Sequence, residues 1–490
     1  MDNDNGHRFP GNGQPWWSKY PLLREDMGEL PAGNAANGLL RAAERHPNSP
    51  AYRHGGRACS YAKLLRRSLR YANGLKSIGI KPGDRVAIYL PSVPDAIAAY
   101  YGVLLAGAVA VPFHENCGLE EAIRRTVETE AAAAIVGRSL VPDPESFREA
   151  AAVIKVIVIE ERRGSWAQKE AARSVWSKWR TAMAKGEGAC VNGLAFLRSS
   201  SPEGAGEGRD DGEPAVIQYT NGTTGQAKGA ILTHGAVAAG AAQLAYWIKG
   251  VNAEQELDVL NAPVLHPAGL AVLNASVYRG GCLTISPSPM RPSGKYWLAE
   301  AASPALALPP RSRGSDGALG YPLPRAEARI VGEDSWDDLP PDTVGELAVR
   351  GPQTAIGYWA HDPIPAEGWI RTGDLARRDE EGCFYRADRK RNRLATAQGT
   401  MLPIEAESAL CGHPAVLRAC VIGVEEEGGS VSARALVVLR GDRTASAAQL
   451  DRWVRNRLGR KGVTMRYEFV KELPSTLWGE ALKRELQPRF

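Results

Sequence analysis

The chain has few cysteines, and their arrangement does not indicate a disulfide framework. Seven of them are scattered singly along 490 residues, without a Cys-x-x-Cys pair. An odd, dispersed set in a long chain is typical of reduced thiols, so we expect a cytoplasmic protein. An excess of one charge is also missing, because 60 basic side chains face 55 acidic ones. The net charge of +5 argues against a nucleic-acid partner, although it suits an anionic small substrate.

Long hydrophobic runs are absent as well. One long uncharged stretch, residues 96–114, approaches the length that spans a membrane, but it contains glycines and a proline and divides into a helix and a strand. The first residues contain neither the basic nor the apolar region of a signal peptide, and we find no internal repeat. We therefore expect a globular protein of two or three domains without a transmembrane segment.

What the chain does contain is an alternation of helical and strand patterns. Helices are predicted over 94–107 and 119–130, and strands over 108–113, 132–136 and 153–159. Strands of this kind, separated by helices, indicate βαβ units and a parallel sheet covered on both faces. Residues 186–212 are rich in Ser, Gly, Glu and Asp, so we interpret them as an exposed linker.

One glycine- and threonine-rich stretch indicates phosphate binding. Residues 218–229 follow a short apolar run that is typical of a buried strand, and an Ala-rich helix begins near Ala236. Glycines allow several backbone N–H groups to face one point, Thr hydroxyls add uncharged donors, and Lys228 supplies a cation. A flexible surface loop is the alternative. The spacing differs from a Walker A loop because Gly229, rather than Ser or Thr, follows Lys228.

The same stretch resembles the signature of the adenylate-forming enzymes, which include acyl-CoA synthetases, peptide-synthetase adenylation domains and luciferases. Their usual pattern is Thr-Ser-Gly-Thr-Thr-Gly-x-Pro-Lys-Gly, and this chain has Asn221 in place of Ser and Ala227 in place of Pro. The longer run is most similar to bacterial long-chain fatty acid–CoA ligases. The resemblance covers nearly the whole chain. It implies an α/β fold, with a large N-terminal domain of parallel or mixed sheets and βαβ units at residues 1–388 and a small α+β cap domain at 389–490.

The resemblance assigns ATP to the glycine-rich loop and to later blocks of the chain. It implies that Tyr296 packs near adenine and that Glu300 holds Mg²⁺, although Glu300 also fits a solvated helix carboxylate. It implies that Asp374 accepts hydrogen bonds from the ribose, with a turn aspartate as the alternative. Arg389 corresponds to a second ribose contact, and Arg391 to the hinge about which the cap domain rotates. The residues that would cradle the phosphates are Thr220, Asn221, Gly222, Thr223, Thr224, Gly225 and Lys228.

The region of the acyl pocket departs from the family pattern. Only ten residues, 286–295, separate the strand expected to end at Ile285 from Tyr296, where the family has a long helix-and-strand segment that forms much of this pocket. Trp297 also replaces a Gly of the pattern. His266 corresponds to a residue that lines the acyl tunnel, and a core histidine is the alternative. We therefore expect a shortened or blocked tunnel and poor use of long acyl chains.

The C-terminal catalytic position departs from the pattern too. Residues 472–486 align with it without gaps, but the family's Lys, which stabilises charge in the adenylation step, is Glu480 here. Lys483, one helical turn further on, is a candidate substitute or a solvated helix lysine. The Gly-Gly loop that meets CoA in the family is Ala397-Gln398 in this chain.

The resemblance implies a ligase that uses a fatty acid, ATP and CoA. The fatty acid carboxylate would attack the α-phosphate of ATP in the presence of Mg²⁺, giving acyl-AMP and pyrophosphate, and the CoA thiol would then displace AMP. The resemblance leaves room for association with a membrane surface. Two other classes stay open. One is a catalytically impaired or inactive nucleotide-binding homologue, which Glu480 and Trp297 favour, and the other is an interaction protein, which would not need an intact phosphate loop.

Overall fold

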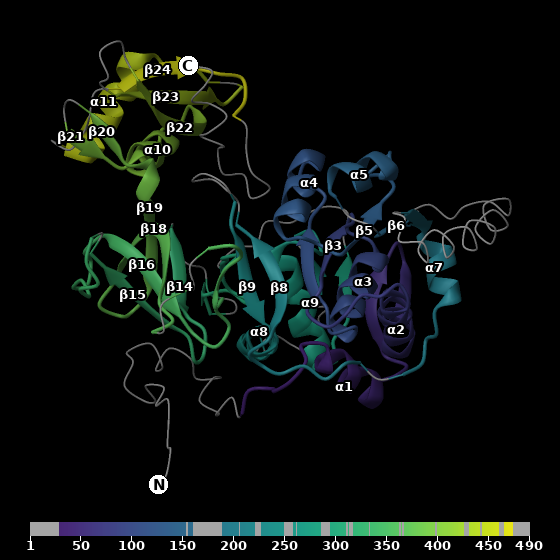
Figure 1. Ribbon diagram of the computed structural model, residues 1–490. Helices are drawn as coiled ribbons and strands as arrows, with labels where there is room; N and C mark the ends of the chain where they lie inside the picture. Colours follow the sequence, from purple (N-terminus) through teal and green to yellow (C-terminus); the bar gives the residue numbers. More distant parts are fainter. Residues whose placement is uncertain are drawn as a thin grey trace, which may run out of the picture.

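The longest sheet of the structure has eight strands, most of which are parallel, as the alternating pattern predicts (Figure 1). Strands β8, β4, β3, β5, β6 and β7 are parallel neighbours, whereas β9 and β17 extend one edge in antiparallel pairing. In spatial order the strands are β17 Gly357–Tyr358, β9 Gly229–Thr233, β8 Pro214–Tyr219, β4 Val109–Phe113, β3 Arg85–Tyr89, β5 Ala133–Gly137, β6 Lys155–Ile159 and β7 Ala189–Asn192. The computed structural model describes residues 29–473 except for 153–154, 160–188, 205, 221–226, 249–257, 261, 286–294, 310–311, 313–316, 333, 362–363, 365–366, 397–398, 426–430, 442 and 460–464.

Two separate hydrophobic cores cover the two faces of this sheet. Successive side chains of a strand point to opposite faces, so Val86 of β3 enters one core and Ala87 enters the other. The helices that connect or cover these strands include α2 Tyr61–Ser77, α3 Pro94–Leu105, α4 Leu119–Glu128 and α5 Pro144–Ala150. Helix α3 is apolar all round because it is buried all round. Helix α2 approaches it so closely that a Cβ on Gly102 would lie 2.3 Å from the Cβ of Tyr71.

Two further sheets belong to the larger part of the molecule. One has four strands in the order β10 Asp258–Leu260, β11 Leu283–Ile285, β1 Pro50–His54 and β2 Arg57–Ser60. The other is antiparallel, in the order β12 Lys295–Tyr296, β13 Leu306–Ala307, β14 Ala318–Pro322, β19 Phe384–Arg389, β18 Ile370–Arg378, β16 Gly345–Arg350 and β15 Glu327–Val331. Helices α1 Asn37–Arg45, α8 His234–Trp247 and α9 Pro267–Arg279 lie in the lower half of Figure 1.

The C-terminal elements have a core of their own and lie at the top left of Figure 1, beyond β19. Strand β23 is the centre of a three-stranded sheet, with β22 antiparallel to it and β24 parallel. Helix α11 begins with a capping box, in which Ser446 and Gln449 each accept from the backbone N–H of the other. The elements are the hairpin β20 Leu394–Thr396 and β21 Gly399–Met401, then α10 Pro403–Cys411, β22 Val416–Glu425, β23 Val431–Leu439, α11 Ala447–Leu458 and β24 Met465–Phe469.

The buried carboxylate of Asp388 connects β19 to this C-terminal part. Asp388 accepts from Asn392 Nδ2 at 2.8 Å and from the backbone N–H of Ile404, in the first turn of α10, at 2.9 Å. It also accepts from the backbone N–H of Arg389 at 2.7 Å. The short 3₁₀ helix η3, Lys390–Asn392, lies between these contacts. The predicted hinge residue Arg391 is in η3.

The α/β fold class is confirmed, and the predicted helices and strands of the large sheet lie within a few residues of α3, α4, β4, β5 and β6. The linker prediction for 186–212 is wrong in part, because it contains β7 and helix α7, Gly193–Ser199. The polar composition of the stretch conceals Phe196, which is fully buried and lies 6.3 Å from Tyr71 between ring centroids. No helix in the described ranges is long and apolar enough to cross a membrane.

Candidate active site

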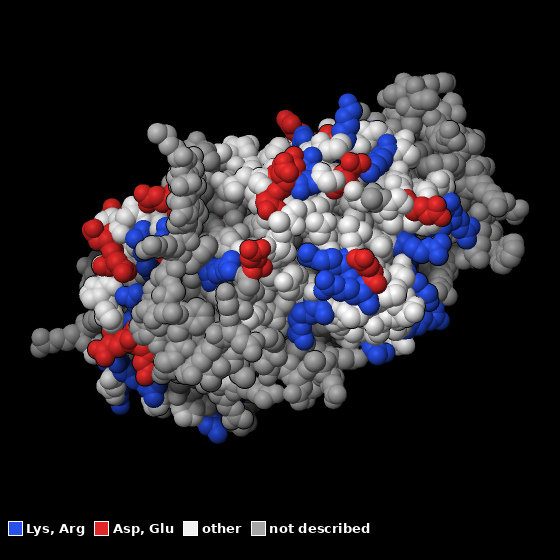
Figure 2. Space-filling model, turned by 90° about the horizontal axis from the view of Figure 1, so that it is seen from below, with Lys and Arg blue, Asp and Glu red and all other residues white. Residues whose placement is uncertain are grey.

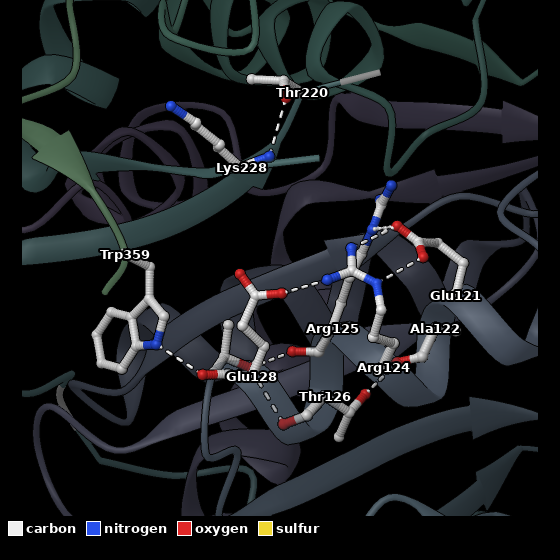
Figure 3. Close-up of polar contacts among 10 residues, drawn as sticks. Glu121, Ala122, Arg124, Arg125, Thr126, Glu128, Thr220, Lys228 and Trp359 are labelled. Atoms are coloured by element: carbon white, nitrogen blue, oxygen red, sulfur yellow. Dashed lines mark hydrogen bonds and ion pairs between the residues drawn. The ribbon is translucent and has the colours of Figure 1, made fainter. Parts of the chain in front are cut away.

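The glycine-rich stretch starts and ends at one point of the eight-stranded sheet. Strands β8 and β9 form a hairpin in which Tyr219 is paired with Gly229. Next to that pair, the backbone N–H of Thr220 donates to the Lys228 carbonyl at 2.9 Å, and the N–H of Lys228 donates to Thr220 Oγ1 at 3.0 Å (Figure 3). Gly229 has no room for a side chain, since a Cβ there would lie 2.7 Å from Cγ2 of Ile217. These contacts fix the backbone of Lys228. The predicted phosphate-binding residues Asn221, Gly222, Thr223, Thr224 and Gly225 lie outside the described residues.

Lys228 and Glu300 are connected through Tyr358. The Lys228 ammonium lies 5.4 Å from the centroid of the Tyr358 ring, and the Tyr358 hydroxyl donates to Glu300 Oε1 at 2.9 Å. Tyr358 reaches this position because β17 pairs with β9, which places Tyr358 opposite Ala230. The sequence predicted Lys228 and Glu300 as site residues but not Tyr358.

The Glu300 carboxyl is in an environment that disfavours its charged form. Burial raises its pKa above the ordinary value, and the Asp374 carboxylate raises it further. The hydrogen bond from Tyr358 and the positive charge of Lys228 oppose this rise. The Glu300 carboxyl therefore interacts electrostatically with both Lys228 and Asp374.

The carboxylate of Glu300 fits a Mg²⁺ site in which phosphate oxygens of a nucleotide supply further ligands. Proteins commonly hold Mg²⁺ with one or two carboxylates together with substrate phosphates. Throughout the described ranges, no group of three or more His, Cys, Asp or Glu side chains is arranged to hold a metal ion. Glu300, which Tyr358 connects to the lysine of the glycine-rich stretch, is the candidate ligand.

The predicted ribose carboxylate is buried and held from two sides. Asp374 on β18 is opposite Arg389 on β19, and Arg389 Nε lies 3.2 Å from Asp374 Oδ1. The Tyr296 hydroxyl donates to Asp374 Oδ2 at 2.5 Å. Burial raises the pKa of Tyr296 well above its usual range, so this hydroxyl stays a donor in alkaline solution as well as at neutral pH. Three residues that are far apart in the sequence, and that were predicted separately, are thus brought into one cluster.

Helix α4 adds a charged network near Thr220 and Lys228 (Figure 3). Arg124 bridges Glu121 at 2.7 Å and Glu128 at 2.5 Å. The hydrogen bond from Arg124 lowers the pKa of Glu121 to about 2, so Glu121 is ionised at neutral pH. The guanidinium of Arg125 lies 4.6 Å from the ring centroid of Tyr219, at the end of β8. The predicted site did not include these side chains, because the arginine pair in a helical pattern is typical of a solvated face.

The two residues predicted to line the acyl pocket, His266 and Trp297, contact other parts of the protein interior. His266 is buried, and its Nδ1 accepts from the backbone N–H of Ala268 at 3.2 Å, which caps α9. Burial lowers its pKa to about 3, with the neighbouring His114 as a second cause, so the ring is neutral. Its centroid lies 5.3 Å from that of His114. Trp297 is partly buried and packs against the core cluster that contains Leu244 and Tyr321. Their contact with an acyl chain stays a prediction.

Two of the predicted C-terminal site residues are not placed by the structure. Glu480, at the position of the family's catalytic Lys, lies outside the described residues, and so does Lys483. The backbone of Arg391 is described in η3, whereas its side chain is not.

Comparison with protein families matches most of the chain. The AMP-binding enzyme family model matches residues 39–295 and 293–359, and the model of the AMP-binding enzyme C-terminal domain matches 405–479. The first two segments meet at 293–295, next to the place where the sequence is shorter than the family pattern.

Similar proteins and structures agree with this match. The long-chain-fatty-acid–CoA ligase of Bacillus subtilis (strain 168) is 28% identical over 548 residues, covering 96% of this chain and 97% of the relative. The feruloyl-CoA synthase of an Amycolatopsis species is 26% identical over 520 residues, covering 92% and 98%. The fold is similar to ATP-bound MatB from Rhodopseudomonas palustris, with a TM-score of 0.78 and 22% identity over 93% of this chain and 98% of that one. It is also similar to AMP-bound o-succinylbenzoate coenzyme A synthetase (MenE) from Bacillus subtilis, with a TM-score of 0.74 and 21% identity over 92% and 98%.

Proposed function

This chain belongs to the AMP-binding enzyme family, and on that premise we propose that it is an ATP-dependent fatty acid–CoA ligase. Adenylate-forming ligases of this family use ATP and CoA. The observation that carries the proposal is the connection of a loop lysine to the Glu300 carboxyl through Tyr358, with the Asp374–Arg389 pair close enough for Asp374 to affect the pKa of Glu300. Lys228, Glu300 and Asp374 then supply one contact each to the phosphates, the metal and the ribose.

The reaction has two steps with balanced bond changes. A carboxylate oxygen of the acid forms a bond to the α-phosphorus of ATP, and the bond to pyrophosphate breaks. The CoA sulfur then bonds to the acyl carbon, the bond to AMP breaks, and the thiol proton leaves. In this chain, Lys228 offers a point charge to phosphate oxygens, and Tyr358 holds both Lys228 and Glu300. A Mg²⁺ ion bound at Glu300 would neutralise part of the phosphate charge.

The ribose would bind to a carboxylate that is already oriented. Asp374 is held by Arg389 and Tyr296 before any ligand is present, and a carboxylate has lone pairs for further donors. Ribose hydroxyls would therefore meet an acceptor that needs little reorganisation. Arg389 would supply a second contact to the ribose.

The acid is proposed to be a short or medium-length fatty acid. The chain between Ile285 and Tyr296 is too short for the family's acyl segment, and the Trp297 ring occupies a position that is Gly in the pattern. An aromatic acid is the second candidate, because one relative is a feruloyl-CoA synthase and a flat ring needs a shallower pocket than an alkyl chain. CoA, a cytoplasmic location and association with a membrane surface complete the proposal, with a domain boundary at 388/389.

Pyrophosphate exchange tests the first half-reaction. Incorporation of labelled pyrophosphate into ATP should depend on hexanoate or decanoate, while benzoate and ferulate test the aromatic alternative and palmitate tests the long-chain resemblance. Thermal unfolding with ATP and Mg²⁺ is the companion measurement. ATP-dependent stabilisation without exchange for any acid would favour a catalytically impaired nucleotide-binding homologue. If both exchange and ATP-dependent stabilisation are absent, the result would favour an interaction protein and contradict the proposed ligase.

A further inference from the structure

A basic groove lies on the molecule away from the candidate active site. It is formed where the C-terminal ends of α1 and α9 meet, and α1 lies at the bottom of Figure 1, whereas α4 lies in the upper part. Its volume is about 380 Å³, within the range of about 300–1,000 Å³ that is usual for small-molecule sites. Its charged and aromatic lining residues are Glu29, Arg41, Arg45, His46, Tyr278 and Arg279.

The three arginines of the groove have no counter-ion within the described part of the chain. None of them forms a side-chain hydrogen bond or ion pair there, and Nη1 of Arg279 is buried without an acceptor. A buried donor that is left without a partner costs about 1–3 kcal/mol, and more if it is charged. The other guanidinium nitrogens of Arg279 have no acceptor among the described residues either, so the side chain is available to an anion that enters the groove.

The placement of Arg41 and Arg45 supports the same conclusion. They are four residues apart on α1, so they lie one turn apart on one side of the helix. Like charges at this spacing destabilise a helix slightly, and an anion bound to both would remove that repulsion. The negative end of the helix dipole explains a cation in the last turn, as for Arg45 and Arg279. It does not explain Arg41, or the lack of an acceptor for Arg279.

The two helix ends are held together, so the arginines converge. Gly280 ends α9 with a φ of +70°, and a Cβ at this position would lie 2.8 Å from Cδ2 of His46, which follows α1. The view from the side of α1 shows Lys and Arg side chains gathered around fewer acidic ones (Figure 2). The lining of the groove also contains Glu29, which forms no ion pair with these arginines.

We propose that this groove binds a soluble phosphomonoester, with the phosphate on Arg41, Arg45 and Arg279 and the rest of the ligand against Tyr278. Guanidinium forks match phosphate oxygens in bidentate geometry. A phosphomonoester has a charge of about −1.5 to −2 at neutral pH, which matches three arginines and one glutamate. Tyr278 is 41% exposed and offers a ring at the rim of the groove. The site is independent of the proposed ligase reaction.

The test is calorimetry of the full chain with inorganic phosphate and with glycerol 3-phosphate. Arg279→Gln and the double variant Arg41→Gln/Arg45→Gln should each weaken binding at least tenfold. Arg66→Gln, at an exposed arginine of α2 outside the groove, is the matched control and should bind normally. Lys228→Ala removes the cation of the phosphate loop and should leave this site intact.

Thermal unfolding separates a lost site from a lost fold. Both ligands should raise the melting temperature of the wild type and of Arg66→Gln but not that of Arg279→Gln, whose melting temperature without ligand should equal or exceed that of the wild type. Equal affinity in the groove variants, or a loss confined to Lys228→Ala, would overturn the proposal. Binding to vesicles of phosphatidylcholine with phosphatidic acid, without binding of either soluble phosphate, would also overturn it in favour of a lipid headgroup.

Discussion

The Tyr296 hydroxyl donates to the Asp374 carboxylate at 2.5 Å, although the two residues are 78 positions apart and come from β12 and β18 of one sheet. Burial raises the pKa of Tyr296, and Asp374 is also buried, with 6% of its surface exposed. The bond leaves Oδ1 to Arg389 and directs the carboxylate before a ribose arrives. Tyr296 is thus a positioning residue for the proposed nucleotide site.

Tyr296→Phe should weaken ATP binding because it removes this orienting bond and keeps the ring. A hydrogen bond to a charged group contributes about 1.5–3 kcal/mol, so we expect the Kd for ATP to rise about tenfold or more. The preference for ATP over 2′,3′-dideoxy-ATP should shrink as well, since an unoriented carboxylate reads the ribose hydroxyls less well. Tyr385→Phe, on the neighbouring strand β19, is the control. An unchanged preference would contradict the positioning role.

Lys228→Ala should weaken ATP binding through the loss of a charge-assisted contact. The expected loss is about 1.5–3 kcal/mol, measured by calorimetry in the presence of Mg²⁺. Lys63→Ala, at an exposed lysine of α2, should have no effect. Equal ATP affinity with and without Lys228 would show that the phosphates bind elsewhere.

Tyr358→Phe should raise the Mg²⁺ concentration needed for half-maximal ATP binding several-fold. The substitution removes the hydrogen bond to Glu300 and keeps the ring beside Lys228, so the metal ligand loses its orientation while the lysine keeps its contact. Tyr358→Leu removes both contacts and should also weaken ATP binding. Tyr467→Phe, where a tyrosine donates to Asp451 in the C-terminal part, is the matched control. If Phe and Leu have the same effect, the hydroxyl has no separate role.

The range of acids accepted should be limited by the short segment before Tyr296. We expect kcat/KM to be highest for short and medium acids and to fall toward palmitate, because a closed tunnel excludes the end of a long chain. Trp297→Gly restores the residue of the family pattern and should shift the optimum to longer acids. A steady rise from short acids to palmitate in the unmodified protein would contradict this expectation.

Glu480 should lower the rate of the first half-reaction more than the rate of the second. The first step needs positive charge near the α-phosphate, whereas the corresponding residue in the family is rotated away during thioester formation. We therefore expect slow acyl-AMP formation from ATP and measurable thioester formation from supplied acyl-AMP. Glu480→Lys should accelerate pyrophosphate release about tenfold for each 1.36 kcal/mol of recovered transition-state stabilisation.

Saturating ATP and a short acid are the conditions for that measurement. A natural chain that is already as fast as Glu480→Lys would show that another residue supplies the charge. Lys483→Ala in both backgrounds identifies whether that residue is Lys483.

The sequence predicted most of the large sheet because its strands and helices have strong periodic patterns. Val109–Phe113 and Ala133–Gly137 are fully buried strands, and such strands appear as continuous apolar runs. Helix α7 was missed because its seven residues stand in a polar stretch and depend on Phe196, whose burial is a tertiary effect. Local composition does not contain that information.

Candidate site residues could be predicted where they belong to a sequence motif. They could not be predicted where only the three-dimensional packing brings them to the site. Lys228, Glu300, Asp374 and Arg389 follow from the resemblance, and the structure brings them close together. Tyr358 joins Lys228 to Glu300 only because β17 pairs with β9, a short antiparallel contact between residues about 130 positions apart, too brief for a sequence pattern to indicate. The pairing of His266 with His114 depends on the packing of the sheet in the same way.

The bonds of Asp388 bear on how often the C-terminal part leaves its present position. If α10 swings away from β19, the bond from the Ile404 N–H is lost, while the bond from Asn392 inside η3 can persist. One hydrogen bond to a carboxylate contributes about 1.5–3 kcal/mol, which alone corresponds to a population ratio of roughly ten to a hundred and fifty. Water that reaches the released N–H and carboxylate lowers this bias, so this hydrogen bond alone would not prevent α10 from leaving β19.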